Sequence, residues 1–371
     1  MNRWENWDET TVRVRPNKKG SRPRTKESPA YSDAVLGRVV TVDRGRYTVS
    51  LPDRAVSAVR AKALRRTPVV PGDLVGLVGD TSGEEGSLAR LVRIEERSTL
   101  LRRSADDTDD AERVLVANAD QLLIVVAAAD PEPRTGFIDR ALVAAYDAGI
   151  TPILLITKSD LADDPTDPAG LISHYSELDL TTVTSSRSSE SSELSAEAVR
   201  RLQDLLDAQV TAMIGHSGVG KSTMVNALTG ADRATGGVNA VTGRGRHTSS
   251  SAVALLLPGE QPPAQGGEQS TGEDTDSWII DTPGIRSFGL AHVDPDDVLA
   301  AFEDLVEGSA DCEPGCAHES PEGGCALDAW VDQGKAGDHG EARLKSLRGL
   351  LASLSGASEG PGEKRLGSVD L

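Results

Sequence analysis

The 371-residue sequence predicts an α/β protein with three folded parts: a small five-stranded β-barrel, a larger domain with a parallel sheet, and a small helical module. Three observations predict this fold class. Short strand-like runs with turn signals fill residues 36–95, apolar strand-like runs alternate with helix-like stretches over residues 121–229, and all three cysteines lie within residues 312–325. At roughly 150 residues per domain, the length is also enough for two to three domains.

The composition excludes several classes of protein. With 39 basic and 58 acidic residues, the net charge is −19, so any contact with nucleic acid is expected to be local. The longest wholly apolar run, residues 122–129, is far shorter than the roughly 20 residues of a membrane-spanning helix, and the polar start lacks a signal peptide's apolar segment. We expect a cytoplasmic monomer that binds no membrane and has no disulfide scaffold.

The chain begins with a basic segment, because residues 12–26 are rich in Lys and Arg and contain no acid. We expect residues 1–34 to be a disordered basic arm. The arm either docks on phosphate groups or only improves solubility, and charge alone does not decide between these roles.

Residues 35–98 contain the barrel strands, which are separated by turn signals at residues 43–45, 71–72 and 82–86. Their number and length suit a small OB-like barrel. Such barrels bind RNA or DNA in many proteins and are purely structural in others, so the pattern predicts a fold and leaves its function open. A linker is expected over residues 97–110.

Residues 110–300 form the predicted α/β domain. Its strand-like runs alternate with helix-like stretches at residues 137–148, 171–178 and 195–206. This alternation predicts a parallel sheet covered on both faces, with ligands at the carboxyl ends of its strands. The acidic residues 258–277, rich in Pro, Gly and Gln, are expected to be a long hairpin loop.

Residues 215–222, GHSGVGKS, match the phosphate-binding loop pattern between a strand-like and a helix-like run. Backbone N–H groups of such a loop surround phosphates, and the helix N-terminus adds positive potential. We expect Lys221 to reach the outer phosphates and Ser222 to ligate Mg²⁺. The expected nucleotide-binding residues here are Gly215, His216, Ser217, Gly218, Val219, Gly220, Lys221, Ser222 and Thr223.

Two further segments fit the phosphate end of the same site. The run WIIDTPG ends a strand at Asp281, a candidate for the Mg²⁺ shell, and the Gly284 N–H is placed to meet the γ-phosphate. Residues 243–248 lie where a switch loop is expected, with Thr248 as a second Mg²⁺ ligand. An ordinary surface loop is the alternative for this short segment.

The base is predicted to be guanine. Guanine recognition needs an acid that accepts from the N1 and N2 groups and a lysine whose stem packs over the ring, and Asp160 and Lys158 supply both. Thr157 stands where Asn is commoner, so one amide contact is missing. Ser185 and Ser186, at another strand end, offer backbone N–H groups to the guanine oxygen. Each segment alone would also suit an ordinary strand-end turn.

The order of these segments predicts circular permutation. In ordinary GTPases the phosphate loop comes first and the base-reading segments come last, whereas here residues 157–160 and 184–186 precede residues 215–222 and 281–284. The sequence therefore predicts a circularly permuted P-loop GTPase domain. The site survives because strand ends converge wherever the chain is cut.

The third part is predicted to bind zinc. Three thiolates and one imidazole can complete a closed, structural Zn²⁺ site. The candidate ligands are Cys312, Cys316, His318 and Cys325. We expect a zinc-binding helical domain over residues 301–356 with one ion that supplies much of its folding energy, followed by a flexible tail over residues 357–371.

Together these features resemble the RsgA/YjeQ family of circularly permuted GTPases, which depend on the small ribosomal subunit. The resemblance runs from about Leu36 to Ser346 and rests on ANADQLLIVV, IDRALVAA, GHSGVGKST, GRHT, DTPGIRSFGL and the Cys/His cluster. It implies GTP binding, subunit-stimulated hydrolysis to GDP, rRNA binding and a part in late subunit maturation. The GTP form would bind the subunit, and hydrolysis would release it.

The resemblance also implies a catalytic residue. Ile285 stands where Ras-like enzymes have a water-orienting glutamine, and His247 matches the histidine suspected of that role in the family. A neutral imidazole can position or deprotonate water; the alternative is that His247 only touches RNA. The zinc spacing, the missing aromatic residues after the cluster and the acidic segment depart from the family pattern.

Rival functions remain open at this point. One is a nucleotide-gated rRNA-binding checkpoint in which hydrolysis is incidental, and another, based on Thr157, is an ATPase with a relaxed base pocket. The barrel, the basic arm and the zinc module are the expected RNA contacts, with Arg102 and Arg103 as additional contacts in the linker.

Overall fold

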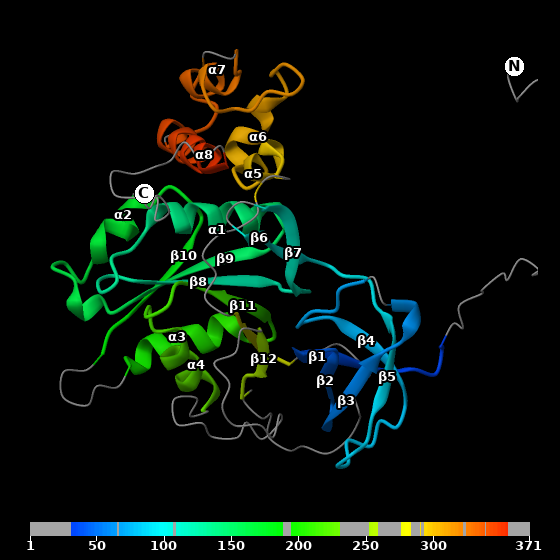
Figure 1. Cartoon of the computed structure of the whole chain (residues 1–371). Coiled ribbons are helices and arrows are strands. Elements are labelled where there is room, and N and C mark those ends of the chain that lie inside the picture. Colours follow the sequence, from blue (N-terminus) through cyan, green and yellow to red (C-terminus); the bar gives the residue numbers. More distant parts are fainter. Residues whose placement is uncertain are drawn as a thin grey trace, which may run out of the picture. The chain divides into compact units, whose positions relative to one another are not determined.

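The computed structural model (Figure 1) describes residues 31–64, 67–106, 109–187, 194–230, 252–258, 276–282, 290, 293–321, 324–337 and 339–354. Most of the predicted basic arm, residues 259–275 of the acidic segment and the predicted C-terminal tail lie outside these residues.

Five strands form the predicted barrel: β1 (Val35–Asp43), β2 (Arg46–Leu51), β3 (Arg54–Arg60), β4 (Leu74–Gly79) and β5 (Ala89–Ile94). They pair in the order β1-β2-β3-β5-β4, and β4 also pairs with β1, which closes the barrel. Alternate residues along each strand face inward, so Val49, Val56 and Leu77 form a fully buried core. The barrel prediction is confirmed.

Residues 97–110, expected to be a linker, lie largely within a β-hairpin in the structure. Strands β6 (Leu100–Asp106) and β7 (Asp109–Ala117) pair antiparallel in a separate two-stranded sheet. Only the base of this hairpin is apolar, where Leu101 pairs with Val116 and both are buried. The rest of its sequence is polar and charged, so the apolar alternation that signals a strand is missing.

The α/β domain is built on β8 (Gln121–Ala127), β9 (Thr151–Thr157), β10 (Thr181–Ser185), β11 (Val210–Ile214) and β13 (Trp278–Asp281), which are parallel in the order β10-β9-β8-β11-β13. Strand β12 (Val253–Leu256) pairs antiparallel with β13, so the two strands that flank the acidic segment form a hairpin as predicted. The carboxyl ends of the parallel strands meet at one edge.

Helices cover both faces of this sheet, as predicted (Figure 1). On one face α1 (Thr135–Asp147) buries Ile138 and Leu142. On the other face lie α3 (Ala196–Leu206) and α4 (Lys221–Thr229). The apolar residues of α3 recur every four positions, and the hydroxyl of Ser195 caps its first turn by accepting from the Ala198 amide.

The helix expected at residues 171–178 is shorter in the structure. Helix α2 (Leu171–His174) ends at Tyr175, whose buried ring turns toward α1. The Tyr175 hydroxyl donates to Asp139 Oδ1 of α1 at 2.8 Å. This tertiary contact ends the helix where the apolar pattern would continue it.

The barrel and the α/β sheet share one hydrogen-bonded ladder. Thr41 of β1 pairs with Val253 of β12, which makes a continuous 11-stranded sheet. At the same junction, the Arg38 guanidinium lies 6.0 Å from the centre of the Trp278 ring, and its Nη1 donates to the Gly72 carbonyl at 3.3 Å. The two parts are therefore joined by main-chain and side-chain contacts.

The C-terminal module consists of α5 (Pro295–Leu299), α6 (Glu303–Ser309), α7 (Leu327–Asp332) and α8 (Gly340–Leu354). Helix α8 packs on α1 and on the other three helices. Arg343 of α8 donates to the Asp304 carboxylate of α6 at 2.8 Å and to the Glu177 carbonyl beyond α2 at 2.7 Å. These bonds tie the module to the α/β domain.

Among the helices that the structure describes, none has both the length and the apolar character needed to cross a membrane.

Gly72 allows the close approach at the barrel junction, since a Cβ there would lie 2.0 Å from the Ala117 carbonyl oxygen. We expect Gly72→Ala to destabilise the protein by roughly 2–4 kcal/mol, the sum of left-handed backbone strain and a forced main-chain shift. Gly86→Ala is the matched control, because Gly86 has a similar φ of +88° with nothing near its Cβ position. Thermal unfolding of both variants measures the difference; equal losses would contradict the predicted clash.

Candidate functional site

The phosphate-binding segment follows the carboxyl end of β11, and α4 begins within it at Lys221. Gly215, Gly218 and Gly220 all have positive φ, a conformation that glycine adopts without strain. A Cβ on Gly215 would lie 2.3 Å from the Val125 carbonyl oxygen, so the tight turn requires glycine. The structure places the loop and the helix N-terminus as the sequence predicts.

Lys221 lies within this loop. Its Nζ donates to the carbonyl oxygens of Gly215 at 2.5 Å and His216 at 2.8 Å. Burial lowers the pKa of Lys221, and the negative charge of Asp281 acts in the opposite direction. Electrostatic interaction therefore links the candidate phosphate ligand to the candidate Mg²⁺ ligand.

Asp281 ends β13 beside β11, with Met213 as its register partner. The next residue, Thr282, donates through Oγ1 to the Met213 carbonyl at 2.7 Å. This bond holds the chain beside the phosphate loop where it leaves the strand. Gly284, His247 and Thr248 lie outside the described residues.

Thr157 at the end of β9 is buried and connects two parts of the site. Its Oγ1 lies 2.5 Å from the Val219 carbonyl oxygen of the phosphate loop and 3.1 Å from the Val126 carbonyl oxygen of β8. The hydroxyl at this position thus ties the strand that precedes the candidate base-reading residues to the phosphate loop.

The two residues expected to read the base follow Thr157. Lys158 has a left-handed backbone, with φ of 54°, and its Nζ donates to the Asp130 carbonyl oxygen. Asp160 is exposed, and its Oδ1 accepts from the Arg187 amide at 3.0 Å. The carboxylate is held in place by the loop that follows β10.

Ser185 ends β10 next to Thr157 of β9 in the sheet register. Its side chain is 1% exposed, and its Oγ has no hydrogen-bond partner among the described residues. A buried hydroxyl without a partner costs free energy, so it fits a polar ligand atom at this edge. Ser186, the next residue, accepts through its carbonyl from the Ser195 amide at 3.0 Å.

The sequence analysis did not single out Arg187. Besides its amide bond to Asp160, its Nη2 donates to Thr223 Oγ1 of α4 at 3.2 Å. The only signal in the sequence was its position directly after the strand-end serines.

The Cys/His cluster is assembled in the C-terminal module. The ligand atoms of Cys312, Cys316, His318 and Cys325 all lie within 4.8 Å of one another. His318 Nδ1 is 3.7 Å from the sulfur atoms of both Cys312 and Cys325. A tetrahedral zinc, with Zn–S of about 2.3 Å and Zn–N of about 2.0 Å, sets sulfur–nitrogen separations of roughly 3.5 Å, so the geometry fits this ion.

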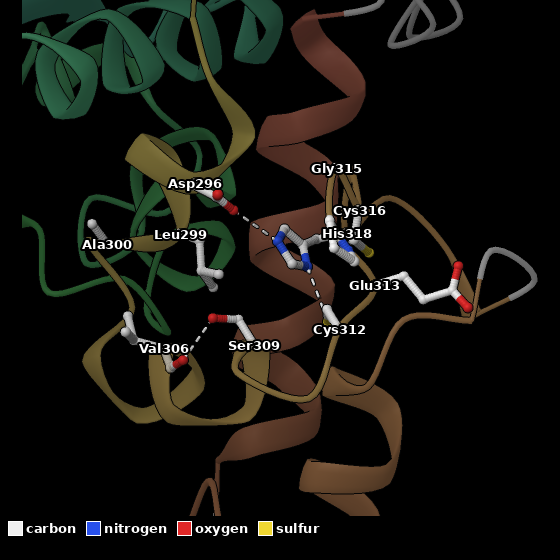
Figure 2. Close-up of a pocket in the computed structure, with 11 residues that line it drawn as sticks. Asp296, Leu299, Ala300, Val306, Ser309, Cys312, Glu313, Gly315, Cys316 and His318 are labelled. Atoms are coloured by element: carbon white, nitrogen blue, oxygen red, sulfur yellow. Dashed lines mark hydrogen bonds and ion pairs between the residues drawn. The ribbon is translucent and has the colours of Figure 1, made fainter.

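The surroundings of the cluster also suit a metal. His318 Nε2 lies 3.0 Å from Asp296 Oδ1 (Figure 2), the carboxylate–imidazole contact that orients metal-bound histidines. Burial, together with the neighbouring thiols, raises the pKa of Cys325 to about 11. A bound cation would remove this cost of ionising the thiols. Asp296 was missed in the sequence because it lies on α5, far from the cysteines along the chain.

Residues 94–291 match the family model described as RsgA GTPase. The small ribosomal subunit biogenesis GTPase RsgA of Pseudomonas aeruginosa (strain UCBPP-PA14) is 35% identical over 277 residues, which cover 74% of this chain and 73% of the relative. The protein of the same name from Ectopseudomonas mendocina (strain ymp) is 38% identical over 244 residues, or 65% of this chain and 63% of that relative.

Two solved structures share the fold. YjeQ from Thermotoga maritima aligns with a TM-score of 0.57 and 23% identity, covering 86% of this chain and 98% of that one. YloQ, described as a circularly permuted GTPase, aligns with a TM-score of 0.52 and 20% identity, covering 88% of this chain and 97% of that one. The predicted fold class, including the permutation, is confirmed.

The Thr157 hydroxyl allows a direct test of the tie between strand and loop. We expect Thr157→Val, which keeps the side-chain shape, to weaken GDP binding by about fivefold, the effect of losing roughly 1 kcal/mol of hydrogen bonding. Thr157→Ser retains the hydroxyl and should bind GDP like the original protein. Fluorescence titration with labelled GDP measures both; equal affinity of the Val and Ser variants would contradict this role.

Proposed function

The chain belongs to the RsgA GTPase family and is a GTP hydrolase, and on this premise we propose that the small ribosomal subunit stimulates its turnover. The protein would bind the subunit in its GTP form during late maturation and leave after hydrolysis. The observation that carries the proposal is the meeting of Asp160, Lys221 and Asp281 at one sheet edge, in permuted order, within a chain whose relatives are named small ribosomal subunit biogenesis GTPases.

Guanine recognition falls to the ends of β9 and β10. The Asp160 carboxylate accepts from the N1 and N2 groups of guanine, and the Lys158 stem packs over the ring. Ser185 and Ser186 provide donors for the guanine oxygen, which would give the buried Ser185 hydroxyl a partner. Adenine lacks the two donors that Asp160 needs, so the pocket rejects it.

The phosphates are held by the loop after β11. Its backbone N–H groups and Lys221 bind the β- and γ-phosphates, while Thr223 lies in the first turn of α4. Ser222, Asp281 and Thr248 would hold Mg²⁺, which would neutralise charge on the phosphate oxygens. Gly284 contacts the γ-phosphate through its N–H.

Hydrolysis needs a group that orients water, and His247 is the proposed residue because Ile285 cannot act in that way. Contact with rRNA or a ribosomal protein would order the segment that carries His247 and Thr248. Turnover of the free protein is therefore slow.

The contacts with rRNA are assigned to the barrel, the basic arm and the zinc module, with Arg102 and Arg103 beside them. The overall charge of −19 restricts such contacts to local basic surfaces. The protein works in the cytoplasm and is a monomer away from the ribosome. In the rival function, a nucleotide-gated checkpoint, GTP binding alone would control the same contacts.

The Cys/His cluster would hold one structural zinc ion, because four protein ligands leave no open position for a reaction. The ion would fix the loop that carries Cys312 and Cys316 against α5 and α8. The proposed domains are those expected from the sequence: the barrel over residues 35–98, the GTPase domain over residues 110–300 and the zinc-binding domain over residues 301–356.

GTP turnover by the full-length protein should rise roughly 10²-fold or more when small subunits are added, within the range that a positioned catalytic group supplies. ATP turnover should stay at background. Higher salt should weaken the stimulation, because phosphate contacts release counterions. Steady-state phosphate release measures all three effects. If the protein binds the subunit in a GTP-dependent way but its GTP turnover does not change, the checkpoint function is favoured.

His247→Ala separates the catalytic part of this proposal from the binding part. It should lower subunit-stimulated turnover by about 10²-fold and leave the affinity for labelled GTP unchanged. His174→Ala, at an exposed histidine of α2, is the control. Full stimulated turnover in the His247 variant would remove it from the chemistry.

Zinc binding predicts one ion per chain in the purified protein, measured by elemental analysis. Cys316→Ser should lower the zinc content and the unfolding temperature, since it removes one of four ligands. Ser309→Ala is the control, because Ser309 lines the same cavity without belonging to the cluster. A metal-free chain that unfolds at an unchanged temperature would refute the structural role of zinc.

A further inference from the structure

Arg187 contacts both ends of the candidate nucleotide site. Its amide donates to Asp160 Oδ1 at 3.0 Å, and its Nη2 donates to Thr223 Oγ1 at 3.2 Å. Asp160 is the proposed base-reading acid, and Thr223 is in the first turn of the helix that follows the phosphate loop. The main chain of Arg187 is therefore fixed on the base side, and its side chain reaches the phosphate side.

The guanidinium retains most of its binding capacity. Within the part of the chain that the structure describes, its side chain makes this one hydrogen bond to a neutral hydroxyl and no ion pair. A guanidinium carries five N–H donors and binds phosphate oxygens well. In a protein with a net charge of −19, a guanidinium whose one bond among the described residues is to a hydroxyl is suited to an incoming anion.

The Arg187 side chain borders an open surface and is not enclosed by protein. Arg187 and Thr223 line an open cavity of about 470 Å³ between α3 and α4, together with Leu194, Val199 and Arg200. Arg200 lies on the same cavity, but its Nε donates to the Ala196 carbonyl of its own helix at 3.3 Å. Of these two arginines, Arg187 is therefore the one bonded to the phosphate-binding helix.

We propose that Arg187 binds the α-phosphate of the guanine nucleotide. This inference rests on the proposed nucleotide site. The α-phosphate is the group that joins the nucleoside to the outer phosphates. The main chain of Arg187 is bonded to the base-reading acid, and its guanidinium is bonded to Thr223 in the first turn of α4, which places the charge between the base-reading segment and the phosphate loop. Lys221, which is bonded to the loop carbonyls of Gly215 and His216, serves the outer phosphates.

This placement has a distinct functional consequence. GDP and GTP share the α-phosphate, so Arg187 contributes equally to the binding of both and does not discriminate between the two states. Its amide bond to Asp160 belongs to the main chain and remains when the side chain is changed. Base selectivity and phosphate affinity can therefore be separated by mutation at a single position.

The test uses the full-length protein with labelled GDP and a non-hydrolysable GTP analogue. Arg187→Ala should weaken both by about tenfold and to the same extent, the effect of a charge-assisted hydrogen bond. Arg187→Lys should recover part of the loss, because it keeps the charge without the planar fork. Arg200→Ala, which removes the same charge from the same cavity, should bind both like the original protein.

Competition by GMP and guanosine then locates the contact. The original protein should prefer GMP over guanosine, and Arg187→Ala should abolish this preference. Equal behaviour of the Arg187 and Arg200 variants, or a loss confined to the GTP analogue, would overturn the proposal. If the original protein binds ADP as well as GDP, the proposed base pocket is refuted. In that case, weaker binding of both ADP and GDP by Arg187→Ala would still support the phosphate contact.

Discussion

The hydrogen-bond ladder of the parallel sheet is the constraint on which the whole site depends. Its register sets Met213 beside Asp281 and Thr157 beside Ser185. Because parallel strands end at the same edge, the residues that follow them meet regardless of their order along the chain. Circular permutation is therefore compatible with the site, whereas register is not free to change: a slip of one residue would turn Asp281 to the opposite face of the sheet.

The same ladder continues into the barrel. Thr41 pairs with Val253, and Val253 pairs with Asp281, so a barrel residue and the candidate Mg²⁺ ligand occupy one row across three strands. The close approach at Gly72 and the contact of Arg38 with Trp278 reinforce this junction. A barrel that tilts would pull on the strand that ends in Asp281. If the barrel contacts rRNA as proposed, the rRNA contact and the candidate Mg²⁺ ligand Asp281 belong to the same continuous sheet.

Much of this arrangement could be predicted from sequence, because local patterns encode it. The barrel strands alternate at period two, and the phosphate loop has its glycines where a tight turn needs them. The sequence-based predictions fail where contacts between distant residues determine the structure. The β6–β7 hairpin is apolar only at its base, α2 stops where Tyr175 reaches Asp139, and Asp296 meets His318 only in the folded chain. Thr157 was correctly noted as a departure, but its bond to the Val219 carbonyl crosses from one strand to another loop and leaves no trace in a linear pattern.

Permutation also changes what lies downstream of the segment proposed to contact the γ-phosphate. Thr282 is bonded to the Met213 carbonyl, which fixes the start of this segment to the phosphate-binding strand. The next described helix along the chain, α5, begins at Pro295; its Asp296 contacts His318 of the cluster, and the helix packs on α1 and α8. In a non-permuted GTPase the chain would pass from this segment to the base-reading strands. Here the chain passes from this segment into α5 and the cluster instead, so the proposed γ-phosphate contact and the proposed zinc module are consecutive along the chain.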